Sequence, residues 1–181
     1  YITQEKRNNS DIRTWQGEAN LFHTFHDEST LDVKAYYFYS ERGLPGAVIL
    51  YNPKAEERLW DENFFTQARY KKTFSPKWTL QAQAKFNHSW NKYEDTDVKY
   101  ENGKQTDINR QDEYYLSAAV LYQPVKGLEL SLAQDGFINT LHTNINDSPN
   151  PVRYSSLTAL NARYQWAVSY THLRAHETVL D

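Results

Sequence analysis

The chain contains no cysteine and no methionine. The absence of cysteine excludes a thiol nucleophile, a cysteine-ligated zinc ion and any disulfide framework. The chain also lacks a long hydrophobic run, because its longest purely aliphatic stretch covers only residues 47–50. A membrane-spanning helix needs about 20 apolar residues, so the sequence excludes a helical membrane protein.

Charge of one sign is not in excess either, since the formal net charge is −3 over 181 residues. This balance gives no reason to expect nucleic acid as a partner. A nucleophile motif such as G-x-S-x-G is also missing, and we therefore expect no catalytic residues, no enzymatic activity and no cofactor.

The stretch Trp78–Trp90 alternates apolar and polar residues over thirteen positions. A period of two predicts a strand with one apolar and one wet face. Strands of soluble proteins are mostly 3–10 residues long, so the length is unusual. With a tilt of about 45°, the two tryptophans would lie roughly 28 Å apart along the membrane normal, close to the ~25 Å apolar band of an outer-membrane barrel.

Similar alternation recurs along the chain and predicts about seven strands. Aromatic residues recur near the expected strand ends, where a membrane interface favours them. The alternation blurs at Asp135 and Gly136, where we expect a β-bulge. The patterned stretches are residues 15–25, 31–39, 64–74, 78–90, 114–122, the region from 128 onward, and 158–166.

The expected connections alternate strictly between short and long. The short ones cover residues 27–30, 75–77 and 124–127, and the long ones cover 41–63, 91–111 and 142–153. Short turns at one end and long loops at the other are typical of bacterial outer-membrane barrels. The pattern therefore predicts an all-β antiparallel meander, a partial transmembrane β-barrel, and favours it over a soluble β-protein.

Both ends of the chain depart from the strand pattern. Tyr1 is not a start residue, and we expect the chain to be an internal piece of a longer protein. Residues 168–178 resemble the translation of a sequencing-library adapter. The expected organisation is therefore a barrel segment over residues 1–167, followed by a non-native tail over residues 168–181.

Residues 40–65 contain R-G-L-P-G-A and then R-L-W-D before a new strand. This passage resembles TonB-dependent outer-membrane receptors of the Bacteroides type, notably the cobalamin-receptor-like group. Residues 114–141 are similar to a later hairpin of the same proteins, and the resemblance covers about residues 15–166. It implies a 22-stranded barrel with an N-terminal plug, of which seven strands would form roughly a third of the wall.

The resemblance implies import of a scarce ligand (cobalamin, a siderophore or similar) across the bacterial outer membrane. The partners would be outer-membrane lipid, the imported small ligand, and the TonB complex acting through a plug that this chain does not contain. Two alternatives stay open: a soluble or surface-anchored β-sandwich that binds glycans, and a passive porin-type barrel.

Two sets of candidate site residues follow. Polar residues of two neighbouring strands would line the lumen: Gln67, Arg69, Gln81, Gln83, Lys85 and Asn87. Residues of the long loops would contact an imported ligand: Tyr51, Trp60, Tyr93, Asp95, Asp97 and Tyr100.

No metal site is predicted. The acidic residues Glu94, Asp95, Asp97, Glu101 and Asp107 offer oxygen ligands, but without the spacing of a known calcium loop, and a solvated acidic loop is favoured. His172 and His176 belong to the adapter-like tail. His23 and His26 are three apart on a strand, which places them on opposite faces.

Overall fold

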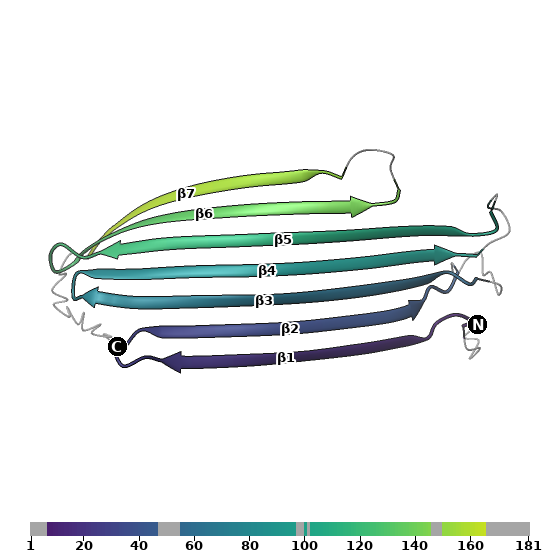
Figure 1. Ribbon diagram of the computed structural model, residues 1–181, viewed down its shortest axis with the longest axis horizontal. Helices are drawn as coiled ribbons and strands as arrows, with labels where there is room; N and C mark the ends of the chain where they lie inside the picture. Colours follow the sequence, from purple (N-terminus) through teal and green to yellow (C-terminus); the bar gives the residue numbers. More distant parts are fainter. Residues whose placement is uncertain (1–6, 47–54, 97–99, 101, 146–149, 166–181) are drawn as a thin grey trace, which may run out of the picture.

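The computed structural model describes residues 7–46, 55–96, 100, 102–145 and 150–165. Seven strands make up most of this part of the chain (Figure 1). They are β1 (Ile12–Thr24), β2 (Thr30–Gly43), β3 (Arg58–Ser75), β4 (Trp78–Asp95), β5 (Gln105–Tyr122), β6 (Leu128–Thr143) and β7 (Val152–Tyr164).

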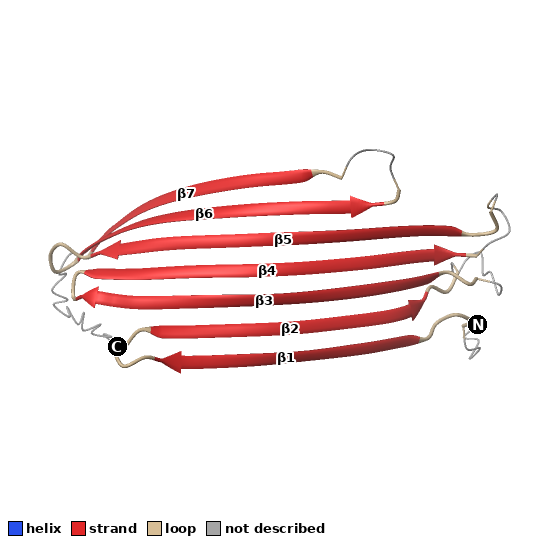
Figure 2. Ribbon diagram, viewed as in Figure 1, coloured by secondary structure: helices blue, strands red, loops and turns tan. Residues whose placement is uncertain are grey.

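All seven strands belong to one sheet, in the order β1-β2-β3-β4-β5-β6-β7. Each strand pairs antiparallel with its neighbour in sequence. Figure 2 shows strands joined by turns and loops, with no helix among the described residues. No helix in this part of the chain is therefore long and apolar enough to cross a membrane. The prediction of an all-β antiparallel meander is confirmed.

The register determines which residues share a face, because side chains of directly paired residues point to the same side of the sheet. Leu80 pairs with Val120, Ala82 with Ala118, and Ala84 with Leu116. The predicted apolar faces of β4 and β5 therefore coincide. We call this side the apolar face; it carries the odd-numbered residues of β1 and β2 and the even-numbered residues of β3 to β7. The opposite side is the polar face.

The sheet has no hydrophobic core in the described part of the chain. Ala55 is the sole buried hydrophobic residue there. Thirteen of the nineteen large hydrophobic side chains that are more than a third exposed lie on the apolar face: Trp15, Leu21, Tyr37, Phe74, Trp78, Tyr114, Leu116, Leu132, Ile138, Val152, Tyr154, Leu160 and Tyr164. One face of the sheet is therefore apolar and uncovered.

Short and long connections alternate as predicted. The short connections are residues 25–29, 76–77 and 123–127, and the long ones are residues 44–57, 96–104 and 144–151. The short connections join strands at one end of the sheet, and the strand ends next to the long connections lie at the other end (Figure 1). We call these the turn end and the loop end.

The predicted long loops were too long, however. The expected loop 41–63 contains the end of β2 and the start of β3, and the expected loop 91–111 contains the end of β4 and the start of β5. Alternation stops there because both faces become polar, while the backbone ladder continues. Hydrogen bonding between strands does not require an apolar face.

The bulge predicted at Asp135 and Gly136 is absent. Both residues pair in unbroken register with β5 and with β7. The alternation blurs there because Gln134 and Gly136 replace apolar residues on the apolar face, and not because the backbone is irregular. The register shift of this sheet lies instead between Thr73 and Ser75, where β3 enters the turn at Pro76.

Candidate functional site

The six residues predicted to line a lumen all lie on the polar face. Gln67 pairs directly with Lys85, and Arg69 pairs with Gln83. Gln81 and Asn87 follow on the same side of β4, paired with Ala119 and Glu113 of β5. The structure therefore brings the whole set together on one surface, opposite to the apolar face.

Ion pairs cross this polar face from strand to strand. The Arg69 guanidinium donates to the Asp32 carboxylate. Lys34 Nζ lies 2.9 Å from Glu18 Oε2, and Lys85 Nζ lies 3.8 Å from Glu113 Oε1. Such partly exposed pairs contribute at most about 1 kcal/mol each. Their main effect is to leave a polar surface whose opposite charges lie side by side.

Aromatic rings also lie on the polar face, which the alternation pattern did not predict. Tyr36 stacks on Phe65 with ring centroids 5.2 Å apart, and Tyr115 lies 4.7 Å from Phe137. Lys85 Nζ is 5.7 Å from the Phe65 centroid. The signal was available, because Tyr36-Tyr37, Phe64-Phe65 and Tyr114-Tyr115 are consecutive aromatic residues. Consecutive residues of a strand must point to opposite faces.

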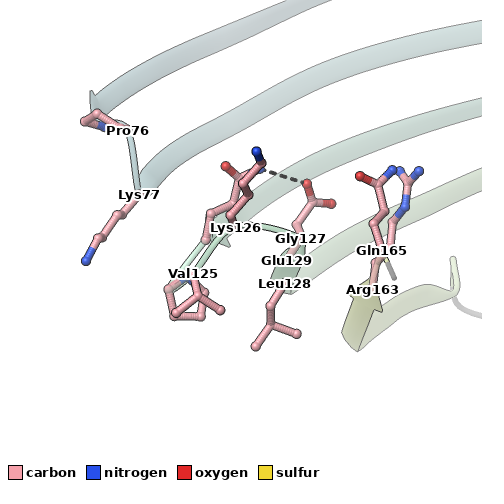
Figure 3. A pocket seen from close by; sticks show the side chains of 11 residues that line it. Pro76, Lys77, Val125, Lys126, Gly127, Leu128, Glu129, Arg163 and Gln165 are labelled. Atoms are coloured by element: carbon pink, nitrogen blue, oxygen red, sulfur yellow. Dashed lines mark hydrogen bonds between the residues drawn. The ribbon is translucent and has the colours of Figure 1, made fainter. Parts of the chain in front are cut away.

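The sheet also has two shallow hollows. One, of about 340 Å³, lies over β1 to β5 on the polar face and is lined by Asp32, Lys34, Arg69, Lys85 and Tyr115 among others. The other, of about 420 Å³, lies at the turn end between the β3–β4 and β5–β6 turns (Figure 3). Gln123 donates a hydrogen bond to Glu129 there. Neither hollow gathers a nucleophile with a base.

The predicted ligand-contacting residues separate into two groups. Trp60 lies within β3 on the apolar face, with Lys92 Nζ 4.6 Å from its ring centroid. Tyr93 and Asp95 lie on the polar face of β4, opposite Asp107 and Gln105. Trp60 and Tyr93 therefore do not share one platform within the sheet.

Asp95 and Tyr100 do meet at the loop end. The Tyr100 hydroxyl donates to Asp95 Oδ2 at 2.9 Å, and Asp95 is buried. Tyr51 and Asp97, the other two predicted contact residues, lie outside the described residues. A ligand site at this end stays a prediction.

Glu94, an acidic residue of the same end, has two lysine partners. Glu94 lies 2.7 Å from Lys92 Nζ and 2.9 Å from Lys104 Nζ. In the described ranges, no group of three or more histidine, cysteine, aspartate and glutamate side chains is arranged to hold a metal ion. Glu101, another of the acidic residues considered, is not among the described positions.

A histidine–carboxylate contact lies on the apolar face, between His88 of β4 and Asp112 of β5. They are direct cross-strand partners, and His88 Nδ1 lies 2.5 Å from Asp112 Oδ1. Phe64, Phe86, Tyr114 and Trp90 lie next to this pair in the register. The pair therefore lies where the apolar band passes into the polar loop end.

Comparisons with protein-family models and with curated proteins find no match to this chain.

Proposed function

We propose that this sheet is a sector of the wall of a TonB-dependent importer in the bacterial outer membrane. The apolar face would contact lipid, and the polar face would look into the barrel lumen. The observation that carries the proposal is a seven-stranded sheet with one exposed apolar face and no buried core in its described part. An apolar face of this kind needs an apolar environment.

Covering the apolar face would contribute a large stabilising free energy. Burying one large apolar side chain is worth about 1.5–3 kcal/mol. Thirteen such side chains on the apolar face are between 40% and 81% exposed. Covering them with lipid would therefore contribute on the order of 10–20 kcal/mol, as much as the roughly 5–15 kcal/mol that stabilises a whole domain.

The two edge strands of the sheet support the proposal that it is part of a larger barrel. Among the described residues, β1 and β7 each pair on one side only, and every residue of β1 is exposed. Long unpaired edges promote aggregation, and closure into a barrel removes them. Further strands on both sides would satisfy the free backbone groups.

Two rival functions would require different surroundings of this sheet. A glycan-binding sandwich requires a second layer on the apolar face, whereas the described strands form one layer. A passive porin has the same wall as an importer and differs by lacking a plug. The importer is favoured by the resemblance of residues 40–65 to TonB-dependent receptors.

The complete gene product decides between these functions. We expect its reading frame to encode a plug with a TonB box upstream of Tyr1. Reconstituted in a planar bilayer, the complete protein should insert without opening a steady conductance, because a plugged barrel does not pass ions freely. Steady open-channel steps would make it a porin, and a water-soluble monomer without detergent would support the sandwich.

A further inference from the structure

The hydrogen-bonded rows of the sheet do not run parallel to the line of the short turns. One row passes through Thr24, Thr30, Lys71, Gln81, Ala119 and Ala133. The centres of the three short turns are Asp27, Pro76 and Lys126. Along the strands, this row lies three residues from the first centre, five from the second and seven from the third. The turns thus step outward by two residues per hairpin, or one residue per strand on average. In Figure 1 each successive short turn reaches further beyond the one before it.

We define the level of a residue as its distance in sequence from the centre of its own short turn. The centres are Asp27 for β1 and β2, Pro76 for β3 and β4, and Lys126 for β5 and β6. Residues of equal level within one hairpin are direct cross-strand partners, and the rows shift by two levels from one hairpin to the next. Lines of equal level are therefore oblique to the hydrogen-bonded rows by one residue per strand on average.

The composition of the apolar face follows these oblique lines. Level 8 is nearly all alanine: Ala19, Ala35, Ala68, Ala84, Ala118 and Gln134. Level 12 is nearly all aromatic: Trp15, Tyr39, Phe64, His88, Tyr114 and Ile138. Level 14 carries the first charges beyond the apolar band: Arg13, Glu41, Glu62, Trp90, Asp112 and Thr140.

The hydrogen-bonded rows show no such order. The row through Phe64 and His88 continues directly to the carboxylate of Asp112. The row through Ala82 and Ala118 contains His23, Leu31 and Tyr70. Aromatic, small and charged residues are thus mixed within rows but separated by level.

We infer that the apolar face meets a bilayer along these oblique lines, with the strands tilted by about 35° from the membrane normal. The inference rests on the proposed function, and it names the surface that meets lipid and its boundaries. A stagger of one residue, about 3.3 Å, per strand spacing of about 4.8 Å gives this angle. The alanine line lies near the midplane, and the charges of level 14 lie among the lipid headgroups of the loop side.

The thickness of the band agrees with this placement. Trp78 and Phe74 lie at level 2, and the aromatic line lies at level 12. Ten residues along a strand tilted by about 35° span roughly 27 Å of the membrane normal. This matches the ~25–30 Å apolar band between aromatic girdles.

Two polar side chains within the band have local partners. Lys72, at level 4, reaches Asp27 of the turn at 2.7 Å and lies 5.3 Å from the Phe74 ring centroid. Such a side chain places its charge at the interface and its stem in the apolar layer. Gln134, at level 8, bonds with Ser156 at 2.9 Å and with Thr158.

The test compares three positions of the apolar face: Ala19, His23 and Ala118. Ala118 shares a hydrogen-bonded row with His23 but shares level 8 with Ala19. The 181 residues contain no cysteine, so a single cysteine at each position can carry a spin label. Depth is measured in the complete protein in lipid vesicles, from collisions with oxygen and with a water-soluble nickel chelate.

We expect the labels at Ala19→Cys and Ala118→Cys to report equal depth near the midplane. The label at His23→Cys should lie about 11 Å nearer the turn-side surface of the membrane. Four residues separate His23 from Ala19 along the tilted strand, which gives this difference in depth. Equal depth for Ala118→Cys and His23→Cys would overturn the tilt and leave the membrane assignment intact. If the nickel chelate reaches all three labels as readily as oxygen does, the proposed function itself fails.

Discussion

An arginine scan of the apolar face tests the depth of individual residues. Ala118 lies on the alanine line of β5, with Ala82 and Gln134 as its cross-strand neighbours. In Ala118→Arg, a guanidinium would replace a methyl group near the bilayer midplane. None of its direct cross-strand partners is an acid, so the new charge would have no counter-ion beside it.

The expected cost depends on depth and on face. Arginine at the midplane of a barrel's lipid face costs about 2–4 kcal/mol, and near the interface it costs about 0–1 kcal/mol. Ala118→Arg should therefore lower the ratio of folded to unfolded protein by about 30- to 900-fold. Thr140→Arg, on the same face at level 14, should have little effect. Gln83→Arg, on the polar face beside Arg69 and Ser117, should also be tolerated.

The assay is urea titration of the complete protein in lipid vesicles, with the folded fraction measured by heat-modifiable electrophoresis. The three variants differ in face or depth but introduce the same side chain, so changes in the unfolded state cancel. Equal losses in Ala118→Arg and Thr140→Arg would refute the depth assignment. Equal losses in Ala118→Arg and Gln83→Arg would refute the assignment of faces.

Three further predictions concern the turns and the tail. The pKa of Asp27 lies well below its ordinary value because Lys72 and Ser29 donate hydrogen bonds to its carboxylate. Its contribution to stability is therefore complete above about pH 4 and is lost as the pH falls through the lowered pKa; Asp27→Asn should flatten the acid side of a plot of unfolding midpoint against pH, and an unchanged slope would contradict this. Gly127 has φ of 87°, and an added Cβ would lie 2.8 Å from the Gln165 carbonyl oxygen, so Gly127→Ala should cost about 1–3 kcal/mol in urea titration. Gly17→Ala, where nothing lies within 4 Å, is the matched control and should change stability by less than about 0.5 kcal/mol. Removing residues 168–181, which lie outside the described part of the chain, should leave the thermal transition unchanged, whereas loss of folding would show that they belong to the protein.

Alternation was sufficient to predict the faces of the sheet. Leu80, Ala82, Ala84 and Phe86 lie on the side that the pattern predicted, because a strand has only two faces and the apolar residues mark one. The alternating lengths of the connections were also correct, since short turns carry local signals such as Pro76 and Gly127.

The ends of the strands were not predictable in the same way. Arg58, Asp61 and Glu94 belong to strands that continue past the apolar band. Both faces are largely polar there, so alternation carries no information. The hydrogen bond between Tyr100 and Asp95 was not predictable either, because it depends on the path of a loop. The stagger of the turns needed the register of the whole sheet, because no single strand contains it.

The measurement that tests the central claim most directly is thiol labelling of Ala82→Cys in intact cells that produce the complete protein. Ala82 lies on the apolar face of the middle strand, and Asn102→Cys, at an exposed position between β4 and β5, serves as the accessible control. If the apolar face contacts lipid, a charged, membrane-impermeant maleimide should label Asn102→Cys but not Ala82→Cys, and a lipid-soluble maleimide should label both. Ready labelling of folded Ala82→Cys by the charged reagent would contradict the account. Resistance to both reagents until the protein is unfolded would place Ala82 in a protein core instead.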